Sequence, residues 1–94
     1  MEIKDSLRCS LRKSLVPNHI HEAIVSYAID HVPPGGFLKA VFKNDLYGSL
    51  AHADQVNRAA IMDIVSFIYA ELPDDCWGDE HAYFKWITQR GNDR

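Results

Sequence analysis

The sequence lacks most of the features that mark the common classes of small protein. Its 94 residues contain two cysteines, Cys9 and Cys76, and no C-x-x-C pair, which is too few for a disulfide framework. No run of about 18 apolar residues occurs, so no membrane span is expected. The basic N-terminus is not followed by the continuous apolar stretch of a signal peptide. We therefore expect a cytoplasmic protein in a reducing setting.

Motifs that mark catalytic and metal sites are also missing. The five histidines form no H-E-x-x-H pair, and no serine lies in a G-x-S-x-G sequence. The acidic pairs Asp74-Asp75 and Asp79-Glu80 lie where helices are expected to begin, and capping explains them. The net charge of −3 gives no reason to expect nucleic-acid binding. We expect no metal and no cofactor, and an enzyme is the less favoured class.

What the sequence does contain is helical periodicity. Hydrophobic residues make up 47% of the chain and charged residues 24%, which is typical of a globular protein. Apolar residues recur at three- and four-residue spacing, and no useful strand alternation interrupts them. This pattern predicts an all-α fold, a compact bundle of four to five helices with short loops. The expected helical segments are 18–31, 36–44, a short piece capped by Asn44 or Asp45, 55–72, and a last helix capped by Asp79 and ended by Gly91.

The segment from Gln55 to Leu72 carries the strongest helix signal. Its apolar residues form a wide face, which favours a central helix covered by its neighbours on more than one side. The residues of this face are Ile61, Ile64, Val65, Phe67, Ile68 and Leu72.

The first 15 residues differ from the rest of the chain. They hold four basic and two acidic residues, a net charge of +2. The remainder of the chain holds six basic and eleven acidic residues, a net charge of −5. We treat residues 1–15 as an amphipathic arm, helical or disordered, and residues 16–94 as the helical domain. An isolated helix of this length is marginal in water, so an ordered arm needs its own domain, a second subunit or a membrane to lie on. Small chains also gain burial by association, so we expect a homo-oligomer, formed through the arm or through helix faces.

The most informative local sequence is Pro-Pro-Gly-Gly at residues 33–36, which leads into an apolar helix. One interpretation of this sequence is a tight corner between two helices. The other is an anion site, because the amides of Gly35 and Gly36 at a helix start can hold phosphate. Lys39 and Lys43 lie four residues apart on one face of that helix and would complete the site. The P-loop and dinucleotide-binding fingerprints are both missing.

Other residues extend this candidate site. Trp77, beside Gly78 in a turn, could stack on a base or anchor a partner, and could equally fold back to plug the bundle. Arg58 could reach a carboxylate or phosphate, or could belong to a solvated helix face. The full candidate ligand-binding set is Gly35, Gly36, Phe37, Lys39, Lys43, Tyr47, Arg58 and Trp77.

A set of residues spread over the chain carries a resemblance to a known family. They are Pro17, the run from Pro33 to Leu38, Ala40-Val41, Asn44-Asp45-Leu46, Ala53-Asp54, Asn57, Tyr69, Cys76-Trp77-Gly78 and Trp86-Ile87. On these residues the chain resembles a family of small helical proteins found mainly in phages and prophages. The resemblance covers about 75 residues, from residue 16 to about residue 90, and excludes the first 15. It implies an origin in a phage and action in the cytoplasm of a bacterial host.

This resemblance suggests a function by analogy. The leading hypothesis is a phage-encoded counter-defence protein, a sponge that binds a nucleotide-derived bacterial immune signal without cleaving it. The glycines and lysines of residues 35–43 would hold phosphate, and Tyr47 or Trp77 would stack on a base. The alternative is a helical module that binds a host or phage protein. A further alternative is a small enzyme that degrades the signal.

Overall fold

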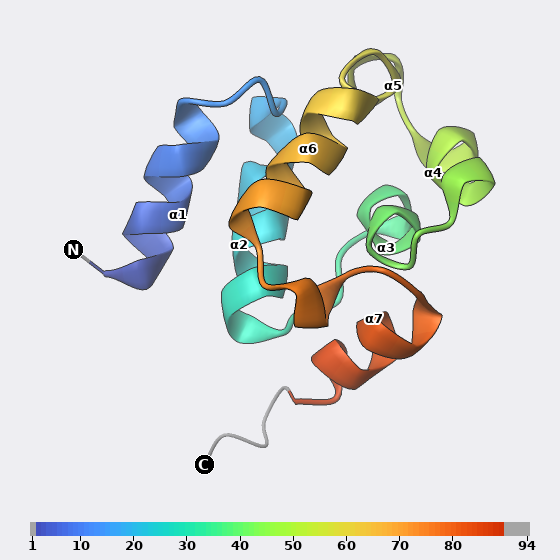
Figure 1. Cartoon of the computed structure of the whole chain (residues 1–94). Helices are drawn as coiled ribbons and strands as arrows, with labels where there is room; N and C mark the ends of the chain where they lie inside the picture. The colour runs from blue at the N-terminus through green and yellow to red at the C-terminus, as the bar shows by residue number, and fades with distance from the viewer. Residues whose placement is uncertain (1, 90–94) are drawn as a thin grey trace.

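The computed structural model describes residues 2–89, and every regular element in that range is helical. Figure 1 shows the helices joined by short loops into one compact body. The predicted all-α fold is confirmed, while the predicted number of four to five helices was too low. In chain order the elements are α1 (Ile3–Arg12), η1 (Asn18–Ile20), α2 (His21–Asp30), α3 (Gly36–Phe42), α4 (Leu46–His52), α5 (Gln55–Ala59), α6 (Ile61–Glu71), η2 (Asp74–Cys76) and α7 (Glu80–Ile87), where η marks a 3-10 helix.

The predicted helix over 55–72 is divided in two at Ala60. Ala60 has φ −103° and ψ 12°, outside the α-helical region, so α5 ends before it and α6 begins after it. Its N–H donates to the carbonyls of both Val56 and Asn57, at 3.1 and 3.2 Å, as happens where a helix tightens at its end. No proline or glycine marks this break, so the apolar periodicity passes through it unchanged.

Three aspartates begin helices as the sequence suggests. The side chains of Asp45, Asp54 and Asp79 accept hydrogen bonds from backbone N–H groups three residues later, at 2.9, 2.7 and 2.7 Å. These caps place the starts of α4, α5 and α7. The predicted stop at Gly91 lies outside the described residues, and α7 ends at Ile87.

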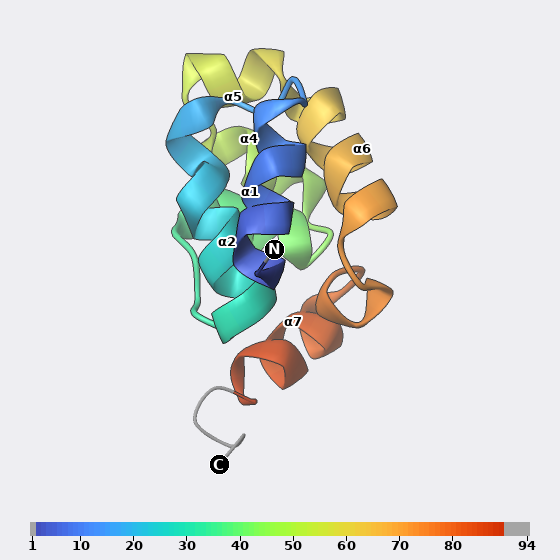
Figure 2. The same ribbon diagram turned by 90° about the vertical axis from the view of Figure 1, so that its left-hand side faces the viewer.

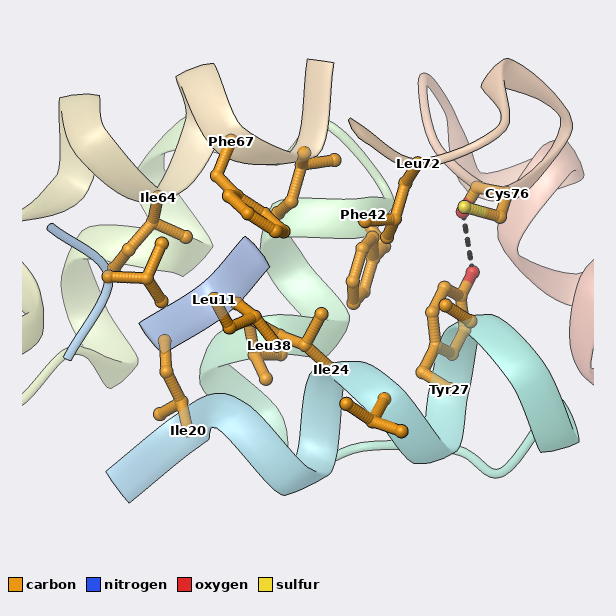
Figure 3. Packing of buried hydrophobic residues seen from close by; sticks show 14 of the residues in the cluster. Leu11, Ile20, Ile24, Tyr27, Leu38, Phe42, Ile64, Phe67, Leu72 and Cys76 are labelled. Carbon is orange, nitrogen blue, oxygen red and sulfur yellow. Dashed lines mark hydrogen bonds between the residues drawn. The ribbon is translucent and has the colours of Figure 1, made fainter. Parts of the chain in front are cut away.

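The core lies where α2, α3 and α6 meet. Figure 3 shows Ile64 and Phe67 of α6 facing Ile20 and Ile24 across the interior. Phe42 of α3 closes the same cluster and is fully buried. Because these side chains come from segments distant in the sequence, the cluster holds the helices together as one unit.

Helix α1 lies beside α2, on the side of the molecule away from α4 (Figures 1 and 2). Its Leu11 is fully buried in the core, and Arg8 makes two hydrogen bonds to Glu22, at 2.9 and 3.0 Å. Ile3 and Leu15, at the two ends of the same apolar stripe, are exposed. Residues 3–12 therefore form an ordered helix that packs on the chain's own domain through the middle of its stripe.

Hydrogen bonds tie the segment after α6 to the core. The hydroxyl of Tyr27 donates to the carbonyl of Cys76 at 2.6 Å, drawn as the dashed line in Figure 3. The N–H of Gly78 donates to the carbonyl of Phe42 at 3.1 Å. The indole N–H of Trp86 in α7 donates to the carbonyl of Tyr27 at 2.7 Å. These contacts fix the loop between η2 and α7, which forms part of the surface described next.

Candidate functional site

An apolar groove lies between α4 and α6 and has a volume of about 360 Å³. Leu46 of α4 forms one wall, and Met62, Val65 and Tyr69 of α6 form the other. Trp77, in the loop after η2, also lines it. Three separate segments of the chain thus contribute large apolar or aromatic side chains to one hollow.

Helix α6 builds its wall because it carries two apolar stripes instead of one. Ile64 and Phe67 point into the core and are buried. Met62, Val65 and Tyr69, spaced i, i+3 and i+7, share a second face, on which they are 71%, 42% and 74% exposed. The expectation that neighbours cover the wide face of this helix on more than one side was therefore wrong at Val65. The residues left uncovered are those that line the groove.

Trp77 is half-buried and lies with its ring centre 5.7 Å from that of Tyr69, at an interplanar angle of 50°. Its indole N–H points to the carbonyl of Leu72 at 3.5 Å, which is at the long limit for a hydrogen bond. The neighbouring Gly78 has φ +123°, a conformation that side chains rarely adopt. The backbone at Gly78 therefore turns so that Trp77 borders the groove.

Gly36, Lys39 and Lys43 of the predicted anion site line a second hollow of about 350 Å³, which shares Asp45 with the groove, whereas Gly35 does not line it. Gly36, Lys39, Lys43 and His52 line it, together with Asp45. The Nζ of Lys43 lies 3.6 Å from a carboxylate oxygen of Glu80, and 5.6 Å from the ring centre of Phe84. One of the two lysines is thus already paired with an acid, and the carboxylate of Asp45 lies on the same hollow.

The glycines at the start of α3 differ in their surroundings. A Cβ atom on Gly36 would lie 3.2 Å from Nδ1 of His52, closer than nearly all such contacts in proteins. A Cβ atom on Gly35 would meet nothing within 4 Å, and Gly35 has an ordinary φ of −69°. Gly36 therefore allows α3 to approach His52 of α4 closely, whereas a side chain at position 35 would meet no neighbour.

The structure divides the remaining sequence-predicted residues among different places. Phe37 is buried in the core, where a bound ligand would not reach it. Tyr47 is 83% exposed and lines neither hollow. Arg58 donates a hydrogen bond to the carbonyl of Leu50 at 3.1 Å, which links α5 to α4. The predicted set therefore forms no single site: Gly36, Lys39 and Lys43 share one hollow, and Trp77 borders the other.

Sequence reasoning missed Leu46, Met62, Val65 and Tyr69 as candidate functional residues. A signal for them exists, because residues 62, 65 and 69 repeat at helical spacing beside the core stripe of α6. Periodicity does not tell which apolar stripe of a helix its neighbours cover. Only the folded arrangement shows that the second stripe is left open.

Comparisons with known proteins give no relative for this chain: no family model, curated protein or solved structure matches it. The resemblance to small phage proteins accordingly stays a prediction. Among the helices between residues 2 and 89, none is long and apolar enough to cross a membrane.

Proposed function

We propose that this protein is a non-catalytic interaction module that binds an amphipathic helix of a partner protein in the groove between α4 and α6. The observation that carries the proposal is the second apolar stripe of α6, which stays exposed and forms a wall of the groove. Contiguous apolar surface of this kind is a common mark of protein interaction sites. Met, Tyr and Trp, which line the groove, are enriched where proteins meet.

A helix suits this groove better than an extended strand. Extended segments bind by adding to the edge of a sheet, and the described residues contain no strand to receive one. Helices bind in grooves between helices by placing side chains at i, i+3 or i+4, and i+7 into apolar pockets. Trp77 and Tyr69 would then contact the anchoring residues of the incoming helix.

A second copy of this chain, docked groove to groove, fits less well. Residues 44–84, which build the groove, contain eight acidic residues and one basic residue. A symmetric dimer through this surface would place the same acidic patch on both sides of the interface, and like charges facing each other oppose binding.

Selection from a displayed library of helical peptides tests the proposal without a known partner. The wild type is the bait, and the double variant Met62→Ser with Val65→Ser tests dependence on the groove. The control is Leu15→Ser with Val56→Ser, which removes two exposed apolar residues elsewhere. We expect selected peptides to carry an apolar stripe, to lose at least about tenfold in affinity for the groove variant, and to keep their affinity for the control. If no selected peptide distinguishes the groove variant from the control, the proposal is wrong.

A second candidate is the sequestration of a nucleotide-derived immune signal by a phage protein in the cytoplasm of a bacterial host. The observation in its favour is the hollow that gathers Gly36, Lys39, Lys43 and His52. Calorimetric titration with cyclic dinucleotides and ADP-ribose tests it. We expect heat of binding from the wild type and none from Lys39→Ala with Lys43→Ala, a variant that should stay folded because it loses only the weak contacts of Lys43 with Glu80 and Phe84. Equal heat from both proteins, or none from the wild type, would rule out this site for those ligands.

A further inference from the structure

Charge is unevenly distributed along the chain. Residues 44–84 carry eight acidic residues and one basic residue, a net charge of −7. Residues 1–43 carry four acidic and six basic residues, a net charge of +2. The acidic segment comprises α4, α5, α6, η2 and the first half of α7, and it supplies nearly all of the groove. The apolar surface therefore lies within the most negative part of the molecule.

Four acidic residues line the groove or lie within three residues, along the sequence, of a residue that lines it. Asp45 lines the groove and also the hollow of Lys39 and Lys43. Asp63 follows the groove residue Met62 on α6, and Asp74 and Asp75 begin η2, shortly before Trp77. All four residues are exposed. Within residues 2–89 none of them takes part in an ion pair, although five ion pairs form elsewhere in that range. Their charge is therefore open to a binding partner.

This charge restricts what can occupy the groove. An anionic membrane, a nucleic acid or a second acidic groove would all be repelled by it. A helix with lysine or arginine beside its apolar stripe would place its positive charges near these acids while its stripe fills the groove. Complementary charges also speed encounter and exclude wrong partners, at a strength that falls with salt.

From these observations we infer that the partner of the groove is a cationic amphipathic helix, with basic residues flanking an apolar stripe. This inference rests on the proposed function, because it names the chemistry of the helix that the groove binds. Asp45 supplies a carboxylate on the groove itself, and Asp63, Asp74 and Asp75 add negative charge close to Met62 and Trp77 in the sequence. The side chains of α4, α6 and Trp77 supply the apolar walls.

Three synthetic peptides separate this inference from the proposed function. All share one leucine stripe in a helix of about 18 residues, roughly 27 Å long, and differ only in carrying lysine, glutamine or glutamate beside the stripe. Fluorescence anisotropy measures their affinities at about 0.05 M and about 0.5 M NaCl. At low salt we expect the lysine peptide to bind at least about tenfold tighter than the glutamine peptide, and the glutamate peptide to bind weakest. The difference should shrink at high salt.

Each failure has a different meaning. If the lysine and glutamine peptides bind equally, the charge inference is wrong and the apolar groove remains a binding site. If none of the three binds, or if all bind the variant Met62→Ser with Val65→Ser as well as the wild type, the groove is not the docking site and the proposed function fails with it.

A matched pair of variants tests whether the charge acts locally. Asp63→Asn with Asp75→Asn removes two charges within two residues of the groove residues Met62 and Trp77, and removes no helix cap. Glu2→Gln with Ser6→Lys changes the net charge by the same amount on or beside α1, away from α4. We expect the first pair of substitutions to lower the affinity for the lysine peptide severalfold and to leave the affinity for the glutamine peptide unchanged. The second pair should change neither affinity. An equal loss from both pairs would show that only net charge matters and would overturn the assignment of this effect to the acids near the groove.

Discussion

Tyr27 joins three parts of the structure through its ring and its hydroxyl. Its ring stacks on Phe42 at 4.0 Å and lies 5.7 Å from that of Tyr83, and its hydroxyl donates to the carbonyl of Cys76. Burial raises the pKa of this hydroxyl, so it stays protonated and remains a donor throughout the neutral range. The bond holds η2, and therefore the loop that carries Trp77, against the core.

Removing this one oxygen should destabilise the fold. We expect Tyr27→Phe to lower the free energy of unfolding by about 1–2 kcal/mol, because the buried carbonyl of Cys76 loses its side-chain donor. Tyr69→Phe, which removes a hydroxyl from an exposed ring, should change it by less than about 0.5 kcal/mol. Urea denaturation of both variants measures the difference. Equal effects would mean that the Tyr27 bond contributes nothing particular to stability.

The two cysteines should differ in reactivity. Burial is the main cause that raises the pKa of the Cys76 thiol, to about 12, with the charges of Asp75 and Asp74 adding to it. The folded protein therefore holds this thiol neutral, and the stability that depends on the neutral form falls as pH rises from about 9 toward about 12. Iodoacetamide at about pH 8.5 should label half-buried Cys9 first and leave Cys76 intact, as mass spectrometry can measure. In urea, which unfolds the protein, we expect both cysteines to be labelled at similar rates. Similar rates in the native protein would contradict the predicted difference in reactivity.

At the scale of single elements, α1 buries one side chain completely in the core, and Leu7 packs against the core from a partly buried position. Leu11 is fully buried, whereas Leu15 on the same stripe is exposed. We expect Leu11→Ala to cost about 2–4 kcal/mol of stability by urea denaturation, and Leu15→Ala less than about 0.5 kcal/mol. Similar costs for the two would show that α1 is not docked as described. Deleting residues 1–15 would open the core, so point variants are the better test of the arm.

Much of the helical layout could be predicted because local chemistry marks it. Pro17, Pro33 and Pro73 separate helices since proline cannot continue one, and aspartate caps begin three of them. The break at Ala60 has no such local mark and arises only in the folded chain. This is why one predicted helix became two.

The candidate site was less predictable than the helices. The apolar spacing of Val65 suggested burial, yet its exposure depends on how far α4 lies from α6, which no local pattern encodes. In contrast, Lys39 and Lys43 were placed together correctly because four-residue spacing fixes their face. Glu80, which pairs with Lys43, is distant in the sequence and could not be foreseen.

At the scale of the whole molecule, the homo-oligomer predicted from chain size stays a prediction, and we expect the exposed apolar residues at the two ends of the N-terminal stripe to form it. Residues 44–84, which supply nearly all of the groove, carry a net charge of −7, while Ile3 of α1 and Leu15 just after α1 are exposed near basic residues. We expect sedimentation velocity to show a lower apparent mass for Ile3→Ser with Leu15→Ser and no change for Met62→Ser with Val65→Ser. The reverse pattern would assign self-association to the groove, and a monomeric wild type would make the predicted oligomer wrong.

The most direct test of the groove as a docking site is chemical-shift mapping by NMR during titration with the lysine peptide. We expect the largest shifts at Leu46, Met62, Val65, Tyr69 and the indole N–H of Trp77, with α1 and the indole of Trp86 unchanged. Shifts concentrated on α1, or on Gly36 and Lys39, or spread evenly over the protein, would contradict binding in the groove.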